Sequence, residues 1–181
     1  MSAVATPGEI VAFWREAGYA KWFQGGKSFD EECRGRFLDA HHAAARREFE
    51  HWIADGEGAL ALILLLDQIP RNVFRGSGHA FATDGLARHY AARAVDAGLD
   101  ARVEPMLRAF FYLPFEHSED LADQHRAVAL FQGIGDVDYT KYAQAHLEVI
   151  KTFGRFPHRN RALGRVNTAE EQTWLDNGGG F

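Results

Sequence analysis

The stretch Ala59-Leu-Ala-Leu-Ile-Leu-Leu-Leu66 is the longest apolar run of the chain and the best guide to its fold. Residues 57–69 leave almost no polar face, which is typical of an element that is buried on all sides. A buried strand is the competing interpretation for so short a run. We favour a helix, because leucine dominates over β-branched residues and no other stretch of the sequence resembles a strand. The run is also too short to span a bilayer.

Helix-start and helix-stop patterns recur on both sides of this buried segment. Capping boxes predict helix starts at Thr6, Ser28 and Thr168. Gly18 is expected to stop the first helix, and Gly154 is expected to end a later one. The sequence therefore predicts an all-α fold of about eight helices, packed as antiparallel pairs that short turns connect.

Three further boundaries follow from capping residues and proline. We expect Asp100 to cap a helix that ends before Pro114, since the residue before a proline avoids the helical region. Ser118 is expected to cap the next helix, and Asp138 the one that runs to about Phe153.

Length, charge and cysteine content narrow the class of protein. The 181 residues predict a single domain, residues 1–181, with residues 176–181 as a frayed tail. A net charge of −5 argues against a nucleic-acid binder. The single cysteine, Cys33, excludes an internal disulfide and fits a cytoplasmic protein, and the N-terminus lacks the pattern of a signal peptide.

Charge is distributed unevenly along the chain. Residues 151–165 contain Lys151 and four arginines without any acid, whereas residues 116–123 contain four acids without lysine or arginine. The basic segment also contains Phe153, Phe156 and Leu163, which would anchor it to a core. If the two segments meet, they form a charged site with internal compensation.

Three segments in combination resemble a known family. They are Leu62-Ile-Leu-Leu-Leu-Asp-Gln-Ile-Pro-Arg-Asn-Val-Phe-Arg-Gly76, Phe110-Phe-Tyr-Leu-Pro-Phe-Glu-His-Ser-Glu-Asp120 and Phe153-Gly-Arg-Phe-Pro-His-Arg-Asn160. In this order and spacing they resemble the bacterial domain-of-unknown-function family 924. The resemblance implies a superhelical, tetratricopeptide-like array of paired helices and names no reaction. One departure is Ala45-Arg-Arg-Glu48, where the family often has a glycine between its second and third helices.

Polar residues in these segments form a candidate small-molecule site. Arginine forks suit carboxylates or phosphates, and histidine can act as an acid or base near neutral pH. The candidate catalytic residues are His117, Glu119, His146 and His158. The candidate ligand-binding residues are Asp67, Arg71, Asn72, Gln124, Arg155, Arg159 and Asn160. We therefore expect the protein to bind an anionic small molecule, with acid–base catalysis as an open question.

Two other interpretations stay open at this point. A tetratricopeptide-like scaffold could bind a peptide, including its carboxylate. Alternatively, the same polar residues could serve only to tie helices together as buried ion pairs. No His-Glu-x-x-His or Cys-x-x-Cys pattern is present, so we predict no metal and no cofactor, and we expect neither a nucleic-acid nor a membrane partner.

Overall fold

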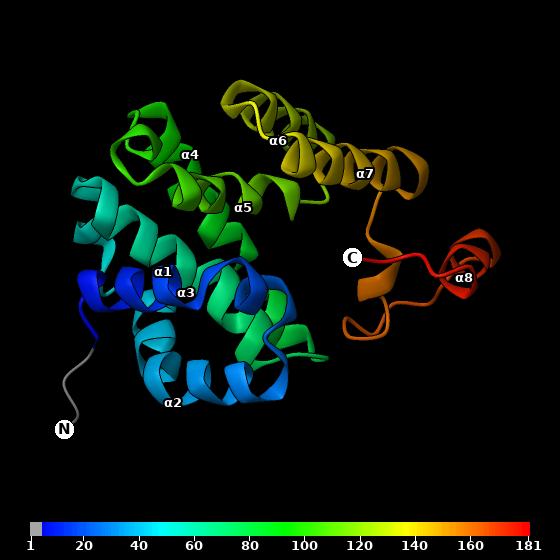
Figure 1. Ribbon diagram of the computed structural model, residues 1–181. Coiled ribbons are helices and arrows are strands. Elements are labelled where there is room, and N and C mark those ends of the chain that lie inside the picture. The colour runs from blue at the N-terminus through cyan, green and yellow to red at the C-terminus, as the bar shows by residue number, and fades with distance from the viewer. Residues whose placement is uncertain (1–4) are drawn as a thin grey trace. The chain divides into compact units, whose positions relative to one another are not determined.

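A computed structural model describes residues 5–181, and these residues form helices and turns without a strand. The α-helices are α1 (Pro7–Gln24), α2 (Gly26–Ala45), α3 (Gly56–Val73), α4 (Asp84–Asp96), α5 (Leu113–Glu116), α6 (Leu121–Ile134), α7 (Val137–Phe153) and α8 (Ala169–Asp176). Short 3₁₀ helices lie between them: η1 (Glu50–Ala54), η2 (Gly78–Phe81), η3 (Asp100–Arg102), η4 (Pro105–Phe111) and η5 (Pro157–Arg159). The predicted all-α fold with eight α-helices is confirmed (Figure 1).

Contacts within the chain divide it into two compact units. Unit 1 comprises residues 1–75 and 79–114, and unit 2 comprises residues 76–78 and 115–181. The sequence predicted one domain.

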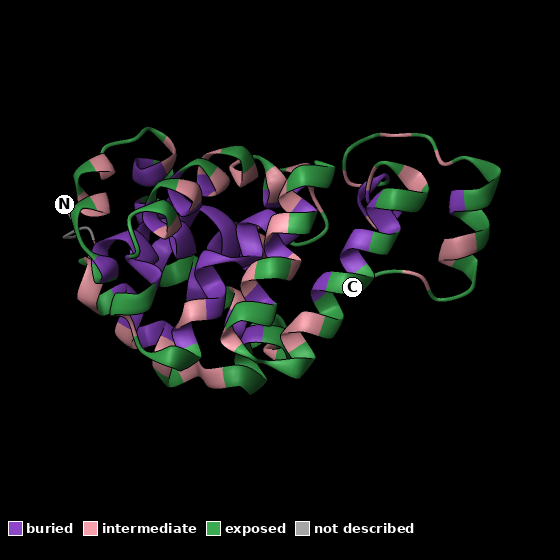
Figure 2. Cartoon of the chain, turned by 90° about the horizontal axis from the view of Figure 1, so that it is seen from above, coloured by how far each residue is buried: buried purple, intermediate pink, exposed green. Residues whose placement is uncertain are grey.

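Unit 1 is organised around α3, the apolar stretch that the sequence marked as a buried helix. Every residue from Ala59 to Leu66 is completely buried. α1, α2 and α4 pack against α3, and buried residues lie on the inward sides of these helices (Figure 2). Gly58 allows close packing, because a Cβ there would lie 2.3 Å from the backbone oxygen of Trp52. Leucine-rich composition therefore identified the central helix correctly.

Several predicted helix boundaries need correction. α2 begins at Gly26 and not at Ser28, because the chain turns directly out of α1 at Gly25, where a Cβ would clash with Phe29. The single helix expected before Pro114 is replaced by the 3₁₀ helices η3 and η4. Pro114 itself is the second residue of α5, a position where its missing N–H costs nothing.

Some of the predicted helix N-caps are confirmed and others are wrong. The capping boxes at Thr6 and Thr168 are confirmed. Asp120, two residues after Ser118, caps α6 and accepts from the amides of residues 122 and 123. Asp136, not Asp138, caps α7. At the start of α6 and at the start of α7, the N-cap is an aspartate two residues away from the predicted one. Sequence spacing alone did not indicate which of two neighbouring capping residues would be the N-cap.

Two backbone breaks lie near expected positions. Gly18 was expected to stop the first helix; with φ 66° and ψ 176° it kinks α1, which continues to Gln24, so the predicted helix end is wrong. α2 ends at Ala45, and Arg47 then adopts φ 64°. This left-handed conformation is the one that glycine supplies most easily. It occurs where the resembling family often has glycine.

Unit 2 contains the helix pair α6 and α7, the loop that follows it, and α8. A short turn connects α6 to α7, and the two helices pack side by side (Figure 1). The inward face of α7 contributes Val149 and Ile150 to a small core with Phe156, against which Phe153 and Trp174 pack. The aromatic anchors predicted for the basic segment are thus partly confirmed, whereas Leu163 is exposed.

Candidate functional site

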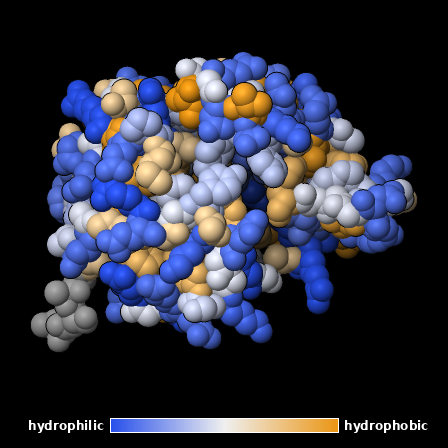
Figure 3. Space-filling view, viewed as in Figure 1, coloured by the Kyte–Doolittle hydropathy of each residue, from blue (hydrophilic) through white to orange (hydrophobic). Residues whose placement is uncertain are grey.

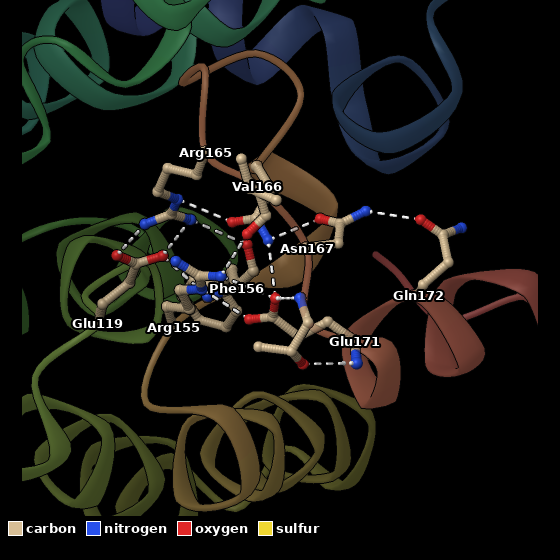
Figure 4. Close-up of polar contacts among 10 residues, drawn as sticks. Glu119, Arg155, Phe156, Arg165, Val166, Asn167, Glu171 and Gln172 are labelled. Carbon is tan, nitrogen blue, oxygen red and sulfur yellow. Dashed lines mark hydrogen bonds and ion pairs between the residues drawn. The ribbon is translucent and has the colours of Figure 1, made fainter.

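The basic loop between α7 and α8 is held by two glutamates. α7 ends at Phe153, and Gly154 reverses the chain with φ 69°. The loop then runs through η5 to Thr168, the N-cap of α8. Figure 4 shows Glu119 on one side of the loop and Glu171 on the other, each facing an arginine.

Glu119 binds the far end of the loop through Arg165. The guanidinium donates two hydrogen bonds, of 2.8 and 2.9 Å, to the two carboxylate oxygens. The backbone amide of Phe156 donates a third, of 2.8 Å. Burial alone would raise the pKa of Glu119, but these hydrogen bonds and the arginine charge lower it below its ordinary value. The acidic segment and the basic loop therefore meet in space.

Glu171 binds the near end of the loop through Arg155. The guanidinium donates bonds of 2.6 and 2.7 Å to its two oxygens. Asn160 Nδ2 and the amide of Thr168 donate further bonds of 3.2 and 2.8 Å to Oε2. The bonds from Arg155 are the main reason that the pKa of Glu171 is lowered to about 2. This carboxylate is ionised at neutral pH, and both of its oxygens accept hydrogen bonds from other protein groups.

Asn160 links the two ion pairs. Its Oδ1 accepts a 2.7 Å bond from Arg165 Nε, while its Nδ2 donates to Asn167 as well as to Glu171. Three of the predicted site residues, Glu119, Arg155 and Asn160, thus direct their polar groups toward other protein groups. In this structure these groups hold the loop.

A second group of predicted residues gathers beside Phe156. We call His117, His146, His158 and Arg159 the histidine cluster. Arg159 donates a 3.0 Å bond to the backbone oxygen of His117, and its guanidinium lies 4.5 Å from the centre of the Phe156 ring. The rings of His146 and His158 each lie 5.6 Å from the same ring. Phe156, completely buried, is the centre of the group.

His146 projects from the inward face of α7 and is 7% exposed. Its Nδ1 lies 2.9 Å from the backbone oxygen of Tyr142 and 3.4 Å from Oε1 of Glu116. Because a carbonyl oxygen can only accept, the ring proton lies on Nδ1 and Nε2 carries the lone pair. Burial lowers the pKa of His146 to about 3, and the nearby positive charges of His117 and Arg159 add to this shift. The imidazole is neutral at neutral pH.

His158 is partly buried within η5. Its Nδ1 is buried and has no hydrogen-bond partner within residues 5–181. Burial lowers its pKa to about 4, and the charges of Arg159 and His117 contribute in the same direction. A second neutral imidazole therefore lies in the cluster, with a polar atom that no protein group satisfies.

Gln124 holds the segment from which His117 projects. It is completely buried in α6, and its Nε2 donates bonds of 2.6 and 2.7 Å to the backbone oxygens of Glu116 and Ser118. Gln124 was predicted as a ligand-binding residue. Here its amide group fixes the backbone on both sides of His117.

Asp67, Arg71 and Asn72 belong to unit 1. Arg71 donates a bidentate pair of 2.8 and 2.9 Å to Asp84 and also lies 3.2 Å from the completely buried Asp67. Asn72 donates to the backbone oxygen of Gln68. Within unit 1 these groups connect the end of α3 to the start of α4.

Sequence reasoning missed three contributors. Glu116 was predicted only as part of the acidic segment and Phe156 only as an apolar anchor of the loop, although Glu116 faces His146 and Phe156 underlies both histidines. Phe181 stacks on His146 with ring centroids 3.6 Å apart. No pattern in the sequence indicated that Phe181, which follows three glycines, would pack against a histidine.

Other candidate features lie outside the histidine cluster. An open hollow of about 460 Å³ is lined by Gln132, Gly135, Asp136, Val137, Thr140, Lys141 and Gln144 at the turn between α6 and α7. Residues 5–181 contain no group of three His, Cys, Asp or Glu side chains arranged to hold a metal ion. Cys33 is buried, which raises the pKa of its thiol to about 12 and makes it a poor nucleophile. None of the helices in the described part of the chain has the length and apolar character needed to cross a membrane.

Comparison with known proteins identifies the family. Residues 10–179 match the family described as bacterial protein of unknown function (DUF924). The chain belongs to this family. A solved structure, the protein of unknown function ATU0120 from Agrobacterium tumefaciens, is similar with a TM-score of 0.91 and 50% sequence identity, over 94% of this chain and 97% of that chain. No curated protein matches the chain significantly.

The family assignment confirms the resemblance carried by residues 62–76, 110–120 and 153–160. Two of these segments supply His117, Glu119, His158 and Arg159, whereas His146 comes from α7, outside the three segments. Neither the family description nor the similar structure names an activity.

Proposed function

We propose that this protein binds a small anionic molecule at the histidine cluster of unit 2. The observation that carries the proposal is the pair of neutral imidazoles beside Phe156. His158 presents a buried Nδ1 without a hydrogen-bond partner among the described residues. His146 is held through Nδ1 by the backbone oxygen of Tyr142. A buried polar atom such as His158 Nδ1 is uncommon unless a water or a ligand satisfies it.

The electrostatics of the cluster favour an anion. The charges of Arg159 and His117 lower the pKa of both His146 and His158, whereas the charge of Glu119 raises that of His158 and the Glu116 carboxylate lies 3.4 Å from His146 Nδ1. The largest charge effects on the two pKa values come from the positive groups. A bound anion would offset the charge of these groups and raise both pKa values. Binding is then coupled to proton uptake, since either ring can become a donor to the anion.

The same geometry suits acid–base chemistry. The bond from Nδ1 to Tyr142 fixes the tautomer of His146 and keeps the lone pair on Nε2. A neutral imidazole with a fixed ring can accept a proton from a bound molecule. With pKa values of about 3 and about 4, His146 and His158 are weak bases in the free protein, and they fit this role when a bound anion raises those values. Glu119 does not contribute a free carboxylate, because Arg165 and the Phe156 amide occupy it.

The proposal is tested by nuclear magnetic resonance of protein with labelled histidines. Inorganic phosphate and acetate are titrated separately at constant ionic strength. We expect the imidazole signals of His146 and His158 to shift, and the signals of the exposed His125 to stay unchanged. Replacing His158 with glutamine should weaken the response of His146, whereas the matched control His125→Gln should not. Buried imidazole signals that respond to neither anion, or that follow ionic strength alone, would refute the proposal.

Two finer features belong to the same proposal. We place the helices in a tetratricopeptide-like superhelical arrangement, which the short connection between the packed helices α6 and α7 supports. A cytoplasmic location is supported by the single free cysteine, Cys33. A peptide carboxylate is one form that the anion can take.

A further inference from the structure

The side chain of Phe181 occupies a defined aromatic environment inside the histidine cluster. Its ring stacks on His146 with a centroid distance of 3.6 Å and an angle of 14° between the planes. It stands edge-on to Phe156 at 6.3 Å and 90°, and to His158 at 5.7 Å and 83°. We call the surface formed by His146, Phe156 and His158 the aromatic slot. One stacked and two perpendicular contacts are the arrangements that aromatic rings prefer.

The walls of the aromatic slot are held independently of Phe181. Phe156 is completely buried, and Arg159 lies 4.5 Å from its ring centre. His146 is held by Tyr142 and faces Glu116. These contacts keep the slot in place when its occupant changes.

Phe181 itself is held only weakly. Its side chain is 54% exposed, although it stacks on one of the most buried histidines. The residues that lead to it, Gly178 and Gly180, both have positive φ values of 83° and 146°. The amides of Gly178 and Gly179 donate to the backbone oxygens of Leu175 and Trp174, and Gly179 packs against the Trp174 ring, so freedom to move is left to Gly180 and Phe181. The occupant is therefore exchangeable, whereas the slot is fixed.

The polar atoms next to the slot place a second requirement on any ligand that binds there. His146 Nε2 and His158 Nδ1 belong to the rings that form its walls, and Phe181 provides no hydrogen bond from its side chain to satisfy either atom. A ligand that fills the slot with a ring and also carries an anionic group would satisfy both the aromatic and the polar parts once an imidazole takes up a proton, because a carboxylate only accepts hydrogen bonds. Phe181 satisfies only the first.

We propose that the aromatic slot recognises a small aromatic carboxylate, with its ring stacked on His146, and that the Phe181 side chain takes the place of this ring when no ligand is bound. This inference rests on the proposed anion site and names its ligand class. An internal occupant lowers the apparent affinity by the fraction of time that it fills the slot. Removing the Phe181 ring should therefore strengthen binding by about threefold to tenfold, as expected for the loss of one competing aromatic stack.

Four probes of matched size or charge separate the ring from the charge. Phenylacetate carries both features, cyclohexylacetate carries the charge on a non-aromatic ring, phenylacetamide carries the ring without the charge, and acetate carries the charge alone. Binding is measured by calorimetry and by the histidine signals. We expect phenylacetate to bind most tightly, and its addition to wild-type protein to shift the ring signals of Phe181 toward those of a solvated phenylalanine.

The matched variants are Phe181→Ala and Val166→Ala, both at exposed side chains of unit 2. Phe181→Ala should tighten phenylacetate binding, and Val166→Ala should leave it unchanged. Equal affinities for phenylacetate and cyclohexylacetate would overturn the aromatic slot while leaving the anion site intact. Weaker phenylacetate binding by Phe181→Ala would show that Phe181 contacts the ligand and is not displaced by it, which also overturns the inference. Failure of all three anions to affect the histidines would remove both proposals.

Discussion

The neutral state of His146 and His158 predicts that unit 2 loses stability in mild acid. In the folded protein the pKa of His146 is lowered to about 3 and that of His158 to about 4. In the unfolded chain both return to the ordinary value of about 6.5. Between these values the unfolded state binds more protons than the folded state, so stability falls as the pH falls below about 6.5.

The magnitude follows from the unfolded pKa alone, because both folded values lie below 5. Between about pH 7 and about pH 5, each histidine that stays neutral in the fold removes about 2 kcal/mol, or about 4 kcal/mol for the pair. The glutamates with lowered pKa, Glu119 and Glu171, act mainly at lower pH. An unfolded glutamate is still largely ionised at about pH 5, since its pKa is about 4.3. The histidines therefore dominate this pH window.

The assay is hydrogen exchange of the backbone amides of α7, which reports the opening of unit 2 by itself. His146→Asn keeps an amide donor near the position of Nδ1 and removes the titrating ring. We expect the opening free energy of the wild type to fall between the two pH values, and the fall to be smaller by about 2 kcal/mol in His146→Asn. His125→Gln, which replaces an exposed histidine, should behave as the wild type. An unchanged pH dependence in His146→Asn would refute the assignment of His146 as neutral and buried.

Two predictions concern unit 1. Arg71→Met should lower the free energy of unfolding by about 3 kcal/mol, because it removes the ion pair between Arg71 and the completely buried carboxylate of Asp67. In urea unfolding, adding Asp67→Asn to Arg71→Met should restore part of the lost stability. If the effects of the two changes simply add, the two side chains are not energetically coupled. Gly58→Ala should lower the melting temperature, since its Cβ would lie 2.3 Å from the backbone oxygen of Trp52. Gly35→Ala is the control, because a Cβ there has no neighbour within 4 Å among the described residues; equal melting temperatures for the two alanine variants would argue against close packing at Gly58.

The helical fold could be predicted because its signals are local. A leucine-rich apolar helix has its lowest free energy in a helical protein when it is completely buried, and residues 59–66 are completely buried. Boundaries were less predictable where several residues could cap equally well. Asp120 and Ser118 are both good capping residues, and the choice between them depends on the path of the preceding backbone, which Gln124 fixes from within α6.

The candidate site could be predicted only in part, because residue type does not reveal the partner of a charge. Arg155 and Arg159 lie four residues apart in the same basic loop and look equivalent in the sequence. Arg155 forms a bidentate pair with Glu171, whereas Arg159 packs over Phe156 next to two histidines. The position of Phe181 depends on a tail of glycines, whose conformation no periodic pattern encodes.

The double use of Glu171 has a consequence for the order of assembly. The same carboxylate closes the capping box of α8 and receives the fork of Arg155. A helix of eight residues has little stability in isolation, since nucleation consumes most of what its few hydrogen bonds supply. We therefore expect α8 to be helical only when the loop has positioned Arg155 and Asn160. The order of α8 would then report whether the loop of unit 2 has folded.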